Sequence, residues 1–419
     1  MRAVAITGIG AVTPLGTTAD STWAGLVAGR SGVGQIETFD PSSFPVRIAG
    51  HVRGFDAASV PAVSGAEYLG RAAGFGAAAA AEALDQAAPS AEAHPSDRRG
   101  VFVGGHVGRP EPEELAEIAH SLALTGGRPE RRRDLASVLT TSQGVDITAI
   151  AEIADANGPV IGISTACASS AHALGEAVRR IRAGEITLAV AGGQDSLTTW
   201  LDVAGFSLLD ALTTTHNDDP QSGSRPFEAT RDGFVLGEGA VFAVLEDGEA
   251  ALARGARVLA WIDGYAATMN AYRITDAPPD GGRSIDVMRR ALDDAGTGPE
   301  AVDAVFAHGT STPGNDISET TAIRAVFGGH ADSLAVTATK SMTGHLTAGA
   351  GALNVLAAVY AFRDQTMPPT INYDQPDPAL TLDHVPHTAR AQRVDRALVN
   401  AFAFGGTNAA LVLRSPHAQ

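Results

Sequence analysis

The side chain best suited to covalent chemistry is the only cysteine of the chain, Cys167. It lies between a short apolar run and an amphipathic helical pattern. The N-terminal end of a helix favours an anion, so a thiol placed there is expected to have a lowered pKa and to become a better nucleophile. A lone cysteine is also typical of an inert buried side chain, and its position alone leaves both interpretations open.

Two histidines are candidates for proton transfer or hydrogen bonding. His308 follows the apolar run 302–307, and His345 stands directly before a second helical pattern. Imidazoles in loops at strand ends can donate hydrogen bonds or act as bases. Taken alone, each of them is more typical of a structural histidine, because the chain contains 12 histidines. A metal site with Cys167 is not expected, since these residues lack the close paired spacing of zinc ligands.

Charged residues near His308 and His345 form a second group of candidates. Lys340 is the only lysine among 30 basic residues, which indicates a place where a compact ammonium fits and a planar guanidinium does not. A surface position remains the alternative for this lysine. Asp316 and Glu319 precede an apolar helical run and could take part in catalysis, but their spacing is also that of a helix capping box.

Near the C-terminal end of the chain, Phe402 and Phe404 are followed by Gly405 and Gly406. Glycines let backbone N–H groups approach a reacting atom closely, so this segment could form an oxyanion hole. A tight turn between two strands explains the same residues.

The elements that must position these side chains alternate between strand and helix patterns. Apolar runs bounded by turn residues predict strands at 3–8, 100–104, 160–165, 187–192, 239–246, 258–265, 302–307, 334–339 and 398–404. Helical patterns between several of these runs predict an α/β architecture.

Two of these units resemble each other. The run 160–165 leads to Cys167 and then to a helical pattern, and the run 334–339 leads through a glycine-containing loop to His345 and another helical pattern. Each unit brings a reactive side chain to the start of a helix, which predicts two similar halves that meet around one site.

Length and composition agree with a large globular protein of two halves. The chain has 419 residues, of which 44% are hydrophobic, and we place the boundary between the halves at Gly255. Residues 1–255 would carry the nucleophilic cysteine and residues 256–419 the two histidines. The net charge of -17 argues against nucleic-acid or anionic-membrane binding, which need a basic surface.

Neither a disulfide framework nor a transmembrane segment is expected. One cysteine cannot form an internal disulfide, and the alanine-rich run 72–83 is too short to cross a bilayer. A cytoplasmic protein is therefore predicted.

Taken in order, these segments resemble the β-ketoacyl-acyl-carrier-protein synthases, in particular the elongating ketosynthases of type II fatty-acid and type II polyketide synthases. The resemblance runs along nearly the whole chain. It includes the motifs AITGIG at 5–10, STACASS at 164–170, RPF at 225–227 and RDGFVLGEG at 231–239, and the segments around His308, Lys340, His345 and Phe404. It implies an acyltransferase with a thiolase-like five-layer αβαβα fold of two related halves, usually dimeric.

The resemblance also implies roles for the candidate residues. Cys167 would accept an acyl chain from an acyl carrier protein as a thioester. His308 and His345 would assist decarboxylation of a malonyl-carrier, and the resulting carbanion would attack the Cys167 thioester in a Claisen condensation. The backbone N–H groups of Cys167 and Phe404 would hold the oxyanion.

Further positions match supporting residues of the family. Lys340 and Glu319 match a buried ion pair, while Thr310 and Thr312 match residues that bind the phosphopantetheine arm of the carrier. For the acyl pocket, Phe404 matches a gate, Phe402 lies beside it, and Val107 matches a dimer-interface position that limits its depth. No permanently bound cofactor or metal is implied.

The sequence departs from the family pattern in two places and is unusual in a third. Asn354 replaces a glutamate and Arg273 replaces a histidine. The segment before the alanine-rich run, which is basic in many relatives, has only Arg71. Carrier docking would then depend more on a cluster of four arginines, although a solvated loop explains them almost as well: Arg128, Arg131, Arg132 and Arg133.

The predicted function is catalytic condensation in a type II polyketide system, with a polyene-forming system as one candidate. Several other functions stay open. A fatty-acid elongation enzyme would act as a homodimer, whereas a polyketide ketosynthase often pairs with a chain-length-factor subunit of the same fold. A non-catalytic subunit of that kind is disfavoured because Cys167, His308 and His345 are all present. A cysteine hydrolase and a carrier-binding scaffold are further alternatives.

Overall fold

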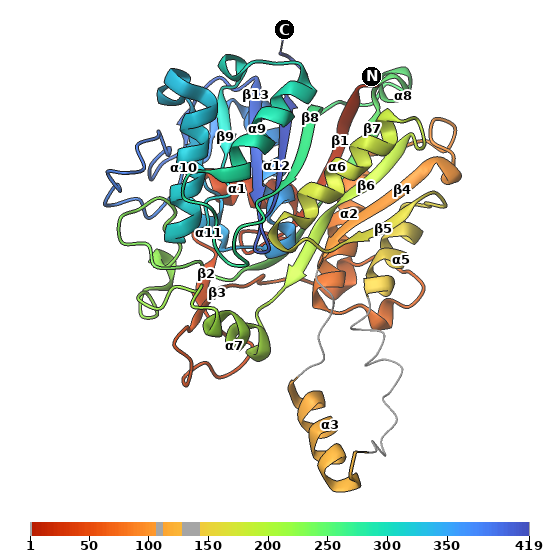
Figure 1. Cartoon of the computed structure of the whole chain (residues 1–419). Coiled ribbons are helices and arrows are strands. Elements are labelled where there is room, and N and C mark those ends of the chain that lie inside the picture. Colours follow the sequence, from red (N-terminus) through yellow and green to blue (C-terminus); the bar gives the residue numbers. More distant parts are fainter. Residues whose placement is uncertain (1, 106–111, 128–142, 419) are drawn as a thin grey trace.

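The computed structural model describes residues 2–105, 112–127 and 143–418 (Figure 1). Its centre is a mixed sheet of ten strands in the order β10-β9-β13-β14-β8-β1-β7-β6-β4-β5. One half contains β1 (Val4–Val12), β4 (Arg99–Gly105), β5 (Val160–Ile163), β6 (Leu188–Ser196) and β7 (Glu238–Asp247). The other half contains β8 (Ala260–Met269), β9 (Ala304–Phe306), β10 (Ala335–Thr337), β13 (Arg396–Phe402) and β14 (Thr407–Arg414).

The two halves of the sheet have the same topology. From the centre outwards, β1, β7 and β6 are antiparallel, and β4 and β5 follow in parallel. In the same way β8, β14 and β13 are antiparallel, and β9 and β10 follow in parallel. Within the described part of the sheet, the two series of strands meet where Ala5 and Ile6 of β1 pair with Trp261 and Ala260 of β8. The predicted duplication is therefore confirmed, with the Cys167 strand β5 and the strand β10 in equivalent places.

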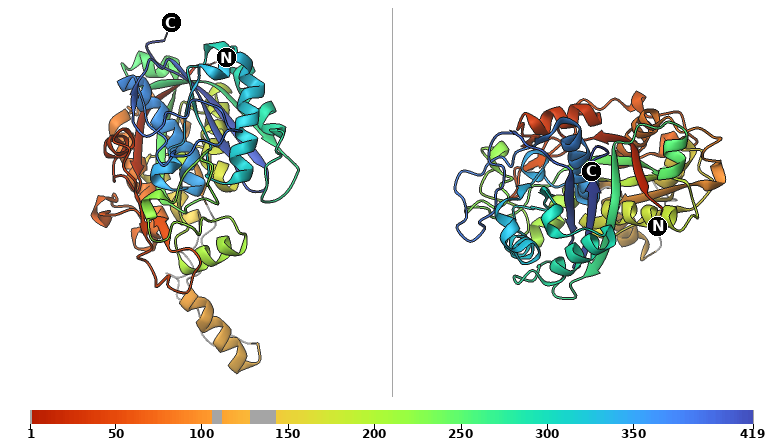
Figure 2. Two further views of the ribbon diagram at one scale, coloured as in Figure 1. Left: turned by 90° about the vertical axis from the view of Figure 1, so that its left-hand side faces the viewer. Right: turned by 90° about the horizontal axis from the view of Figure 1, so that it is seen from above.

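Helices cover both faces of the sheet and fill the space between its halves, giving five layers (Figures 1 and 2). The central layer consists of α6 (Ser169–Arg182) and α12 (Ala350–Asp364), which contact each other and both series of strands. The helices α2 (Arg71–Ala87) and α5 (Gln143–Ile153) cover one outer face, and α9 (Gly282–Ala295) and α10 (Pro313–Phe327) cover the other.

The remaining elements are shorter or peripheral. They are α1 (Ala19–Val27), α3 (Pro112–Thr125), α7 (Trp200–Leu208), α8 (Gly248–Ala253), α11 (Lys340–Thr343), β2 (Val33–Gln35), β3 (Ile48–Gly50), β11 (Thr366–Met367) and β12 (Arg390–Ala391). Helix α3 lies apart from the body of the molecule (Figure 1). In the part of the chain that the structure describes, no helix combines the length and the apolar character needed to cross a membrane.

The two central helices bury their surfaces to different extents. In α6 the apolar side chains at 173, 174, 177, 178 and 181 are fully buried, while the arginines of the helix lie toward its C-terminal end. In α12 every residue from Ala350 to Phe362 is buried, as expected for a helix that is apolar all round. Both N-terminal ends are thereby held rigidly beside the loops that carry Cys167 and His345.

Small residues let α2 lie directly on the sheet. A Cβ atom added to Gly8 or Gly10 of β1 would come within 1.9 Å of the Ala83 carbonyl oxygen or 2.1 Å of the Ala79 carbonyl oxygen. No side chain larger than hydrogen fits at such distances. The alanine-rich composition of α2 is thus explained by close packing.

The strand β14 was not predicted from the sequence. Its residues are buried on both faces, as are those of β7, which the sequence did predict. It lies between β13 and β8 in the middle of one half of the sheet. The turn from β13 to β14 contains Phe404, Gly405 and Gly406, and the two glycines have φ values of 87° and 83°.

Candidate active site

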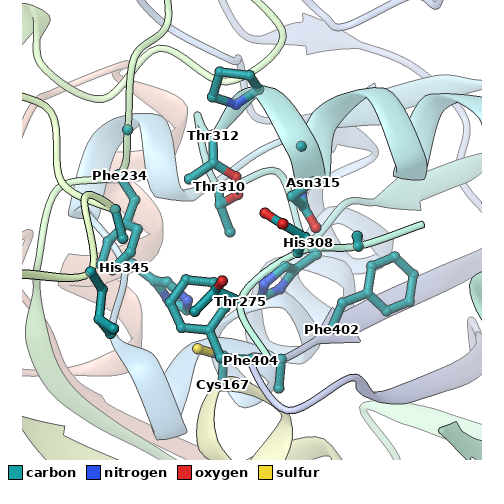
Figure 3. Close-up of a pocket in the computed structure, with 18 of the residues that line it drawn as sticks. Cys167, Phe234, Thr275, His308, Thr310, Thr312, Asn315, His345, Phe402 and Phe404 are labelled. Atoms are coloured by element: carbon teal, nitrogen blue, oxygen red, sulfur yellow. Dashed lines mark hydrogen bonds between the residues drawn. The ribbon is translucent and has the colours of Figure 1, made fainter. Parts of the chain in front are cut away.

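Cys167 is presented on a strained turn between β5 and α6. The preceding residue, Ala166, has a φ of 49°, a left-handed conformation that costs energy for a residue with a Cβ atom. Ser169 braces the turn, because its hydroxyl accepts a hydrogen bond from the Thr165 amide at 2.9 Å and donates one to the Ala166 carbonyl at 2.7 Å. The turn fixes the thiol in a pocket that also contains His308 and His345 (Figure 3).

Burial dominates the ionisation of Cys167 and raises the pKa of its thiol to about 11. The charge of Lys340 and hydrogen bonds from the backbone amides of Phe404 and Cys167 act in the opposite direction. The expected net lowering of the pKa by the helix end is therefore wrong, since desolvation of the thiolate outweighs it. Two amides aimed at one sulfur atom are also the geometry needed to hold an oxyanion formed on a carbonyl group bound there.

His345 points a hydrogen-bond donor into this pocket. Its Nδ1 accepts a hydrogen bond from the Thr347 amide at 3.2 Å, which places the proton of the neutral ring on Nε2. That Nε2 is buried and has no partner among the described residues. Burial and the charge of Lys340 hold the pKa of His345 well below its usual range, so the ring is neutral at pH 7.

His308 is arranged in the same way. Its Nδ1 lies 3.4 Å from Lys340 Nζ, and because an ammonium only donates, the ring proton is again assigned to Nε2. Burial, Lys340 and His345 lower the pKa of His308 well below its usual range. The centroids of the two imidazoles are 5.4 Å apart (Figure 3). The site therefore contains two neutral N–H donors beside the thiol.

Lys340 is 2% exposed, so the surface position considered for it is wrong. Burial lowers the pKa of this lysine to about 8, while Glu319 and Cys167 act to raise it. Its ammonium donates to the carbonyl oxygen of His308. Lys340 thus places a positive charge near Cys167 and also hydrogen-bonds the backbone carbonyl of His308.

Glu319 supports His308 from the other side. Its carboxylate accepts hydrogen bonds from the backbone amides of His308 and Gly309, each at 2.8 Å, and from Asn400 Nδ2 at 3.0 Å. Among the described residues no salt bridge joins Glu319 to Lys340. The two residues meet through the His308 backbone, Lys340 at its carbonyl and Glu319 at its amide.

The capping-box interpretation of Asp316 and Glu319 is wrong. Helix α10 begins at Pro313 after Thr312, so both acidic residues lie within the helix. Asp316 accepts hydrogen bonds from the amides of Thr310 at 3.1 Å and Phe227 at 2.8 Å. Its burial raises the pKa to about 6. Both carboxylates organise the loop that precedes the helix.

Asn354 links the two loops that carry His308 and Lys340. Its Nδ2 donates to the carbonyl of Ala307 at 2.9 Å, and its Oδ1 accepts from the hydroxyl of Thr339 at 2.7 Å. An ionised glutamate, as in the family pattern, could not donate to that carbonyl. The side-chain amide of Asn354 therefore holds the residue before His308 by its carbonyl and the residue before Lys340 by its hydroxyl.

The candidate residues surround one pocket of about 300 Å³. It is lined by seven residues expected from the sequence: Cys167, His308, His345, Thr310, Thr312, Phe402 and Phe404. The hydroxyl oxygens of Thr310 and Thr312 are 2.8 Å apart. Lys340 and Glu319 lie behind the histidines rather than in the wall. Val107, Arg128, Arg131, Arg132 and Arg133 lie outside the described residues.

Sequence reasoning did not single out some residues of the pocket wall. Phe234 packs with its ring centroid 5.4 Å from that of His345 and 6.3 Å from that of Phe404. It belongs to the motif RDGFVLGEG, which could have drawn attention to it. Three acidic residues, Asp210, Asp232 and Asp276, also line the pocket, and no sequence signal marked them as neighbours.

Arg71, considered for carrier docking, and Arg273, which departs from the family pattern, both pair with acidic residues. Arg71 binds the buried carboxylate of Glu238 at 2.8 Å, so its charge is already compensated. Arg273 is exposed, pairs with Asp276 at 3.1 Å and lies over the ring of Tyr272. Within the described part of the chain, no three or more acidic, histidine or cysteine side chains gather as a metal site would require.

Comparisons with known proteins cover the chain from end to end. Models of the β-ketoacyl synthase N-terminal and C-terminal domains match residues 1–251 and 259–374. The chain is 40% identical to the 3-oxoacyl-acyl-carrier-protein synthase 2 of Synechocystis sp. over 413 residues, which are 99% of this chain and 98% of that protein.

Solved structures of ketosynthases superpose closely on this chain. The ishigamide ketosynthase/chain length factor has a TM-score of 0.88 and 34% identity, with 99% of both chains covered. A type II polyketide synthase acyl-carrier protein in complex with its ketosynthase, bound to the hexaketide, gives a TM-score of 0.87 and 31% identity over 99% of both chains. The predicted thiolase-like α/β fold is thereby confirmed.

Proposed function

The chain belongs to the β-ketoacyl synthase family, and we propose that it condenses a malonyl-carrier with an acyl chain bound to Cys167, with loss of CO2. Membership of this family makes it an acyltransferase. One observation carries the proposal: the amides of Cys167 and Phe404 converge on the thiol in a pocket that also holds the neutral rings of His308 and His345.

The first step loads the acyl chain onto Cys167. The thiol attacks the thioester carbonyl of the acyl-carrier, and the amides of Cys167 and Phe404 hold the oxyanion of the tetrahedral intermediate. Collapse of this intermediate breaks the bond to the phosphopantetheine sulfur. The proton of Cys167 passes to that departing thiolate, so a thiol enters the reaction and a thiol leaves it.

The second step releases CO2 from the malonyl-carrier. Breaking the bond to the carboxylate leaves an enolate, whose negative charge collects on the thioester oxygen. The Nε2–H groups of His308 and His345 can donate to that oxygen. Because burial and Lys340 hold the pKa of both rings well below 7, these donors stabilise the enolate with little tendency to protonate it.

The third step forms the new carbon–carbon bond. The enolate carbon attacks the Cys167 thioester, and the same two backbone amides hold the second oxyanion. Expulsion of the Cys167 thiolate gives the β-ketoacyl-carrier. The charge of Lys340 favours this leaving thiolate, which then takes up a proton from solvent.

The phosphopantetheine arms of the two carriers would enter past Thr310 and Thr312. Their hydroxyls are 2.8 Å apart in the pocket wall and can hydrogen-bond the amide groups of an arm. Phe402 and Phe404 would line the acyl end and Phe404 would gate it. The substrates bring their own phosphopantetheine, so we propose no permanently bound cofactor.

We place the enzyme in a type II polyketide system, with a polyene-forming system as one candidate. The likeness to the ishigamide ketosynthase/chain length factor and to a type II polyketide ketosynthase supports this placement. Fatty-acid elongation is the second candidate, and 40% identity to a 3-oxoacyl-acyl-carrier-protein synthase 2 favours it. The acyl lengths that load onto Cys167 distinguish the two pathways.

A partner subunit of the same fold would cover the edge of β5. Among the described residues β5 pairs only with β4, and Val160 at its start is 41% exposed. The equivalent edge strand β10 is covered by the segment at Asp383, whose carbonyl accepts from the Val336 amide at 2.8 Å. An uncovered edge strand favours pairing with another chain. We propose a second copy or a chain-length-factor subunit there, and a division of each chain into halves near Gly255.

Intact-mass analysis of loading tests the first step. The protein is incubated with acyl-carrier thioesters of increasing chain length, beside a Cys167→Ala control. A single acyl adduct that is absent from the control supports the proposal, and the preferred lengths indicate the pathway. If an adduct forms equally on the control, or if none forms with or without a candidate partner subunit, the proposed role of Cys167 is wrong.

A further inference from the structure

Thr347, two residues after His345, has a strained backbone. Its φ is 45°, a left-handed conformation that a β-branched residue rarely adopts. Such a conformation persists only where the surrounding structure holds it in place. Thr347 is 1% exposed and lines the catalytic pocket, so the strain lies at the candidate active site and not in a surface loop.

Asp195, near the end of β6, makes the contacts that hold this conformation. Its Oδ2 accepts a hydrogen bond from the hydroxyl of Thr347 and another from the amide of Ala348 at 3.3 Å. The other oxygen, Oδ1, accepts from the Ser196 amide at 3.1 Å. Asp195 is 3% exposed, so these hydrogen bonds are shielded from water. One carboxylate therefore binds Thr347 by its side chain and by the peptide that follows it.

The peptide that precedes Thr347 carries the amide that fixes the tautomer of His345. This amide donates to Nδ1 of the ring at 3.2 Å, which leaves the ring proton on Nε2. The direction of the amide depends on the φ of Thr347, because φ is the rotation about the bond between the amide nitrogen and Cα. If Thr347 relaxed to a negative φ, the rigid peptide plane would turn and its N–H would leave Nδ1.

We propose that Asp195 is a positioning residue for His345 and acts through the backbone of Thr347. The inference rests on the proposed function, in which the Nε2–H of His345 donates to the enolate oxygen. Among the described residues Asp195 is not part of the pocket wall, so it acts on Thr347 and not on the substrate. The contact also joins the two series of strands, because β6 belongs to the first and Thr347 follows β10 of the second.

The charge of Asp195 does not help Cys167 to ionise. Burial raises the pKa of this thiol to about 11, and the negative charge of Asp195 acts in the same direction. A nearby anion disfavours a thiolate, so activation of the thiol does not explain a carboxylate at this place. The hydrogen bonds to Thr347 and Ala348 do explain it.

Release of CO2 from malonyl-pantetheine tests this role in Asp195→Ala and Asp195→Asn. The alanine variant has no acceptor for Thr347 and Ala348, whereas the amide oxygen of asparagine can accept both hydrogen bonds. We expect kcat to fall about 10–100-fold in Asp195→Ala and by less than about threefold in Asp195→Asn, with little change in KM. Equal losses in the two variants, or no loss in the alanine variant, would overturn the proposal.

A double-mutant cycle with His345→Ala separates positioning from a general loss of structure. If Asp195 acts through His345, its replacement has little left to disturb once the imidazole is absent. Adding Asp195→Ala to His345→Ala should then slow CO2 release by less than about threefold. A further loss as large as that of Asp195→Ala alone would show that the two residues act independently, and the proposal would be wrong.

Asp247→Ala is the matched control. Asp247 is also 3% exposed and also accepts two backbone hydrogen bonds, from the amides of Glu249 at 3.1 Å and Ala250 at 3.2 Å. It ends β7, whereas Asp195 pairs with Gly239 near the start of that strand. Asp247→Ala should leave the rate of CO2 release unchanged, and a loss equal to that of Asp195→Ala would count against positioning.

Two measurements on the same proteins separate this inference from the proposed function. Loading of Cys167 from acyl-pantetheine, followed by intact mass, should not slow in Asp195→Ala, because the two amides that hold the oxyanion are unchanged; slower loading would contradict a role confined to His345. If wild type and Asp195→Ala release CO2 equally fast, only the positioning role is refuted. If wild type releases no CO2 from malonyl-pantetheine or from malonyl-carrier, the proposed function fails as well.

Discussion

Replacing Asn354 with aspartate should destabilise the protein, because the hydrogen bond that the side-chain N–H donates to the Ala307 carbonyl is lost. In the native chain Nδ2 donates to the Ala307 carbonyl at 2.9 Å, and the side chain is fully buried. An ionised aspartate would place an oxygen against that carbonyl, and a protonated one would have to bind a proton at neutral pH. An unsatisfied buried polar group costs about 1–3 kcal/mol and a charged one costs more. We therefore expect Asn354→Asp to lose about 3 kcal/mol at pH 7.

The pH dependence gives this prediction its sign. Burial should raise the pKa of the new carboxyl in the folded state above its unfolded value of about 3.9. Below that unfolded value both states are protonated and the loss is smallest. As the pH rises above the unfolded pKa, the carboxyl releases its proton in the unfolded state before it does so in the folded state. The loss of folding stability therefore grows until the pH reaches the folded pKa.

Urea unfolding between pH 4 and pH 8 measures both effects. Asn157→Asp is the matched control, because Asn157 is exposed and its side chain makes no hydrogen bond within the described residues. The same variants should show a lower kcat for condensation only at position 354, since Asn354 holds the loops of His308 and Lys340. A loss below about 0.5 kcal/mol at pH 7, or the same pH dependence in both variants, would refute the reasoning.

Three further predictions follow from the site and the packing. At pH 7 Lys340, with a pKa of about 8, is mainly charged and lowers the pKa of Cys167. Lys340→Met should therefore raise the pKa of Cys167 further and slow its alkylation by iodoacetamide, measured by mass. Faster alkylation would contradict this effect of the lysine charge on the thiol. His345→Ala should slow release of CO2 from malonyl-pantetheine by about 10²–10³-fold, the usual cost of losing one oxyanion donor, whereas a loss below threefold would exclude that role. Gly10→Ala should destabilise the protein by about 1–3 kcal/mol in urea, because its Cβ would meet the Ala79 carbonyl at 2.1 Å, and unchanged stability would show that α2 can move away.

The sequence predicted the placement of Cys167 better than its ionisation. A strand, a loop and an amphipathic helix can be read from the order of residues, and the structure has them in that order. The pKa of about 11 depends on how much water the surrounding segments exclude from the thiol. That quantity arises from contacts far apart in the chain, including those of Phe404, and is not visible in a local pattern.

Acidic residues illustrate the same limit. The spacing of Asp316 and Glu319 fits a capping box, but the helix begins earlier, at Pro313, and both carboxylates point to backbone amides of the preceding loop. Only the tertiary fold brings Glu319 to the His308 amide. The pocket wall likewise brings together Asp210 and Asp276, which are more than sixty residues apart in the sequence.

The duplication was predictable because each half repeats the same local unit. As a result, the first half supplies Cys167, the proposed nucleophile, after β5, and the second half supplies His308 and His345 to the same pocket. By contrast, β14 was missed although it is a run of buried residues like β7, which was predicted. The internal repeat would have predicted it, since β14 is the counterpart of β7.

The central claim is that carbon–carbon bond formation occurs at Cys167, and a single-turnover experiment tests it most directly. Protein carrying one acyl chain on Cys167 is mixed with malonyl-carrier labelled with ¹³C in the malonyl group, and products are identified by mass. Condensation predicts one CO2 and one β-ketoacyl-carrier, two labelled carbons longer, for each acyl chain lost from Cys167. Release of the acyl chain as a free acid, without CO2 and without a longer product, would show a cysteine hydrolase and contradict the account.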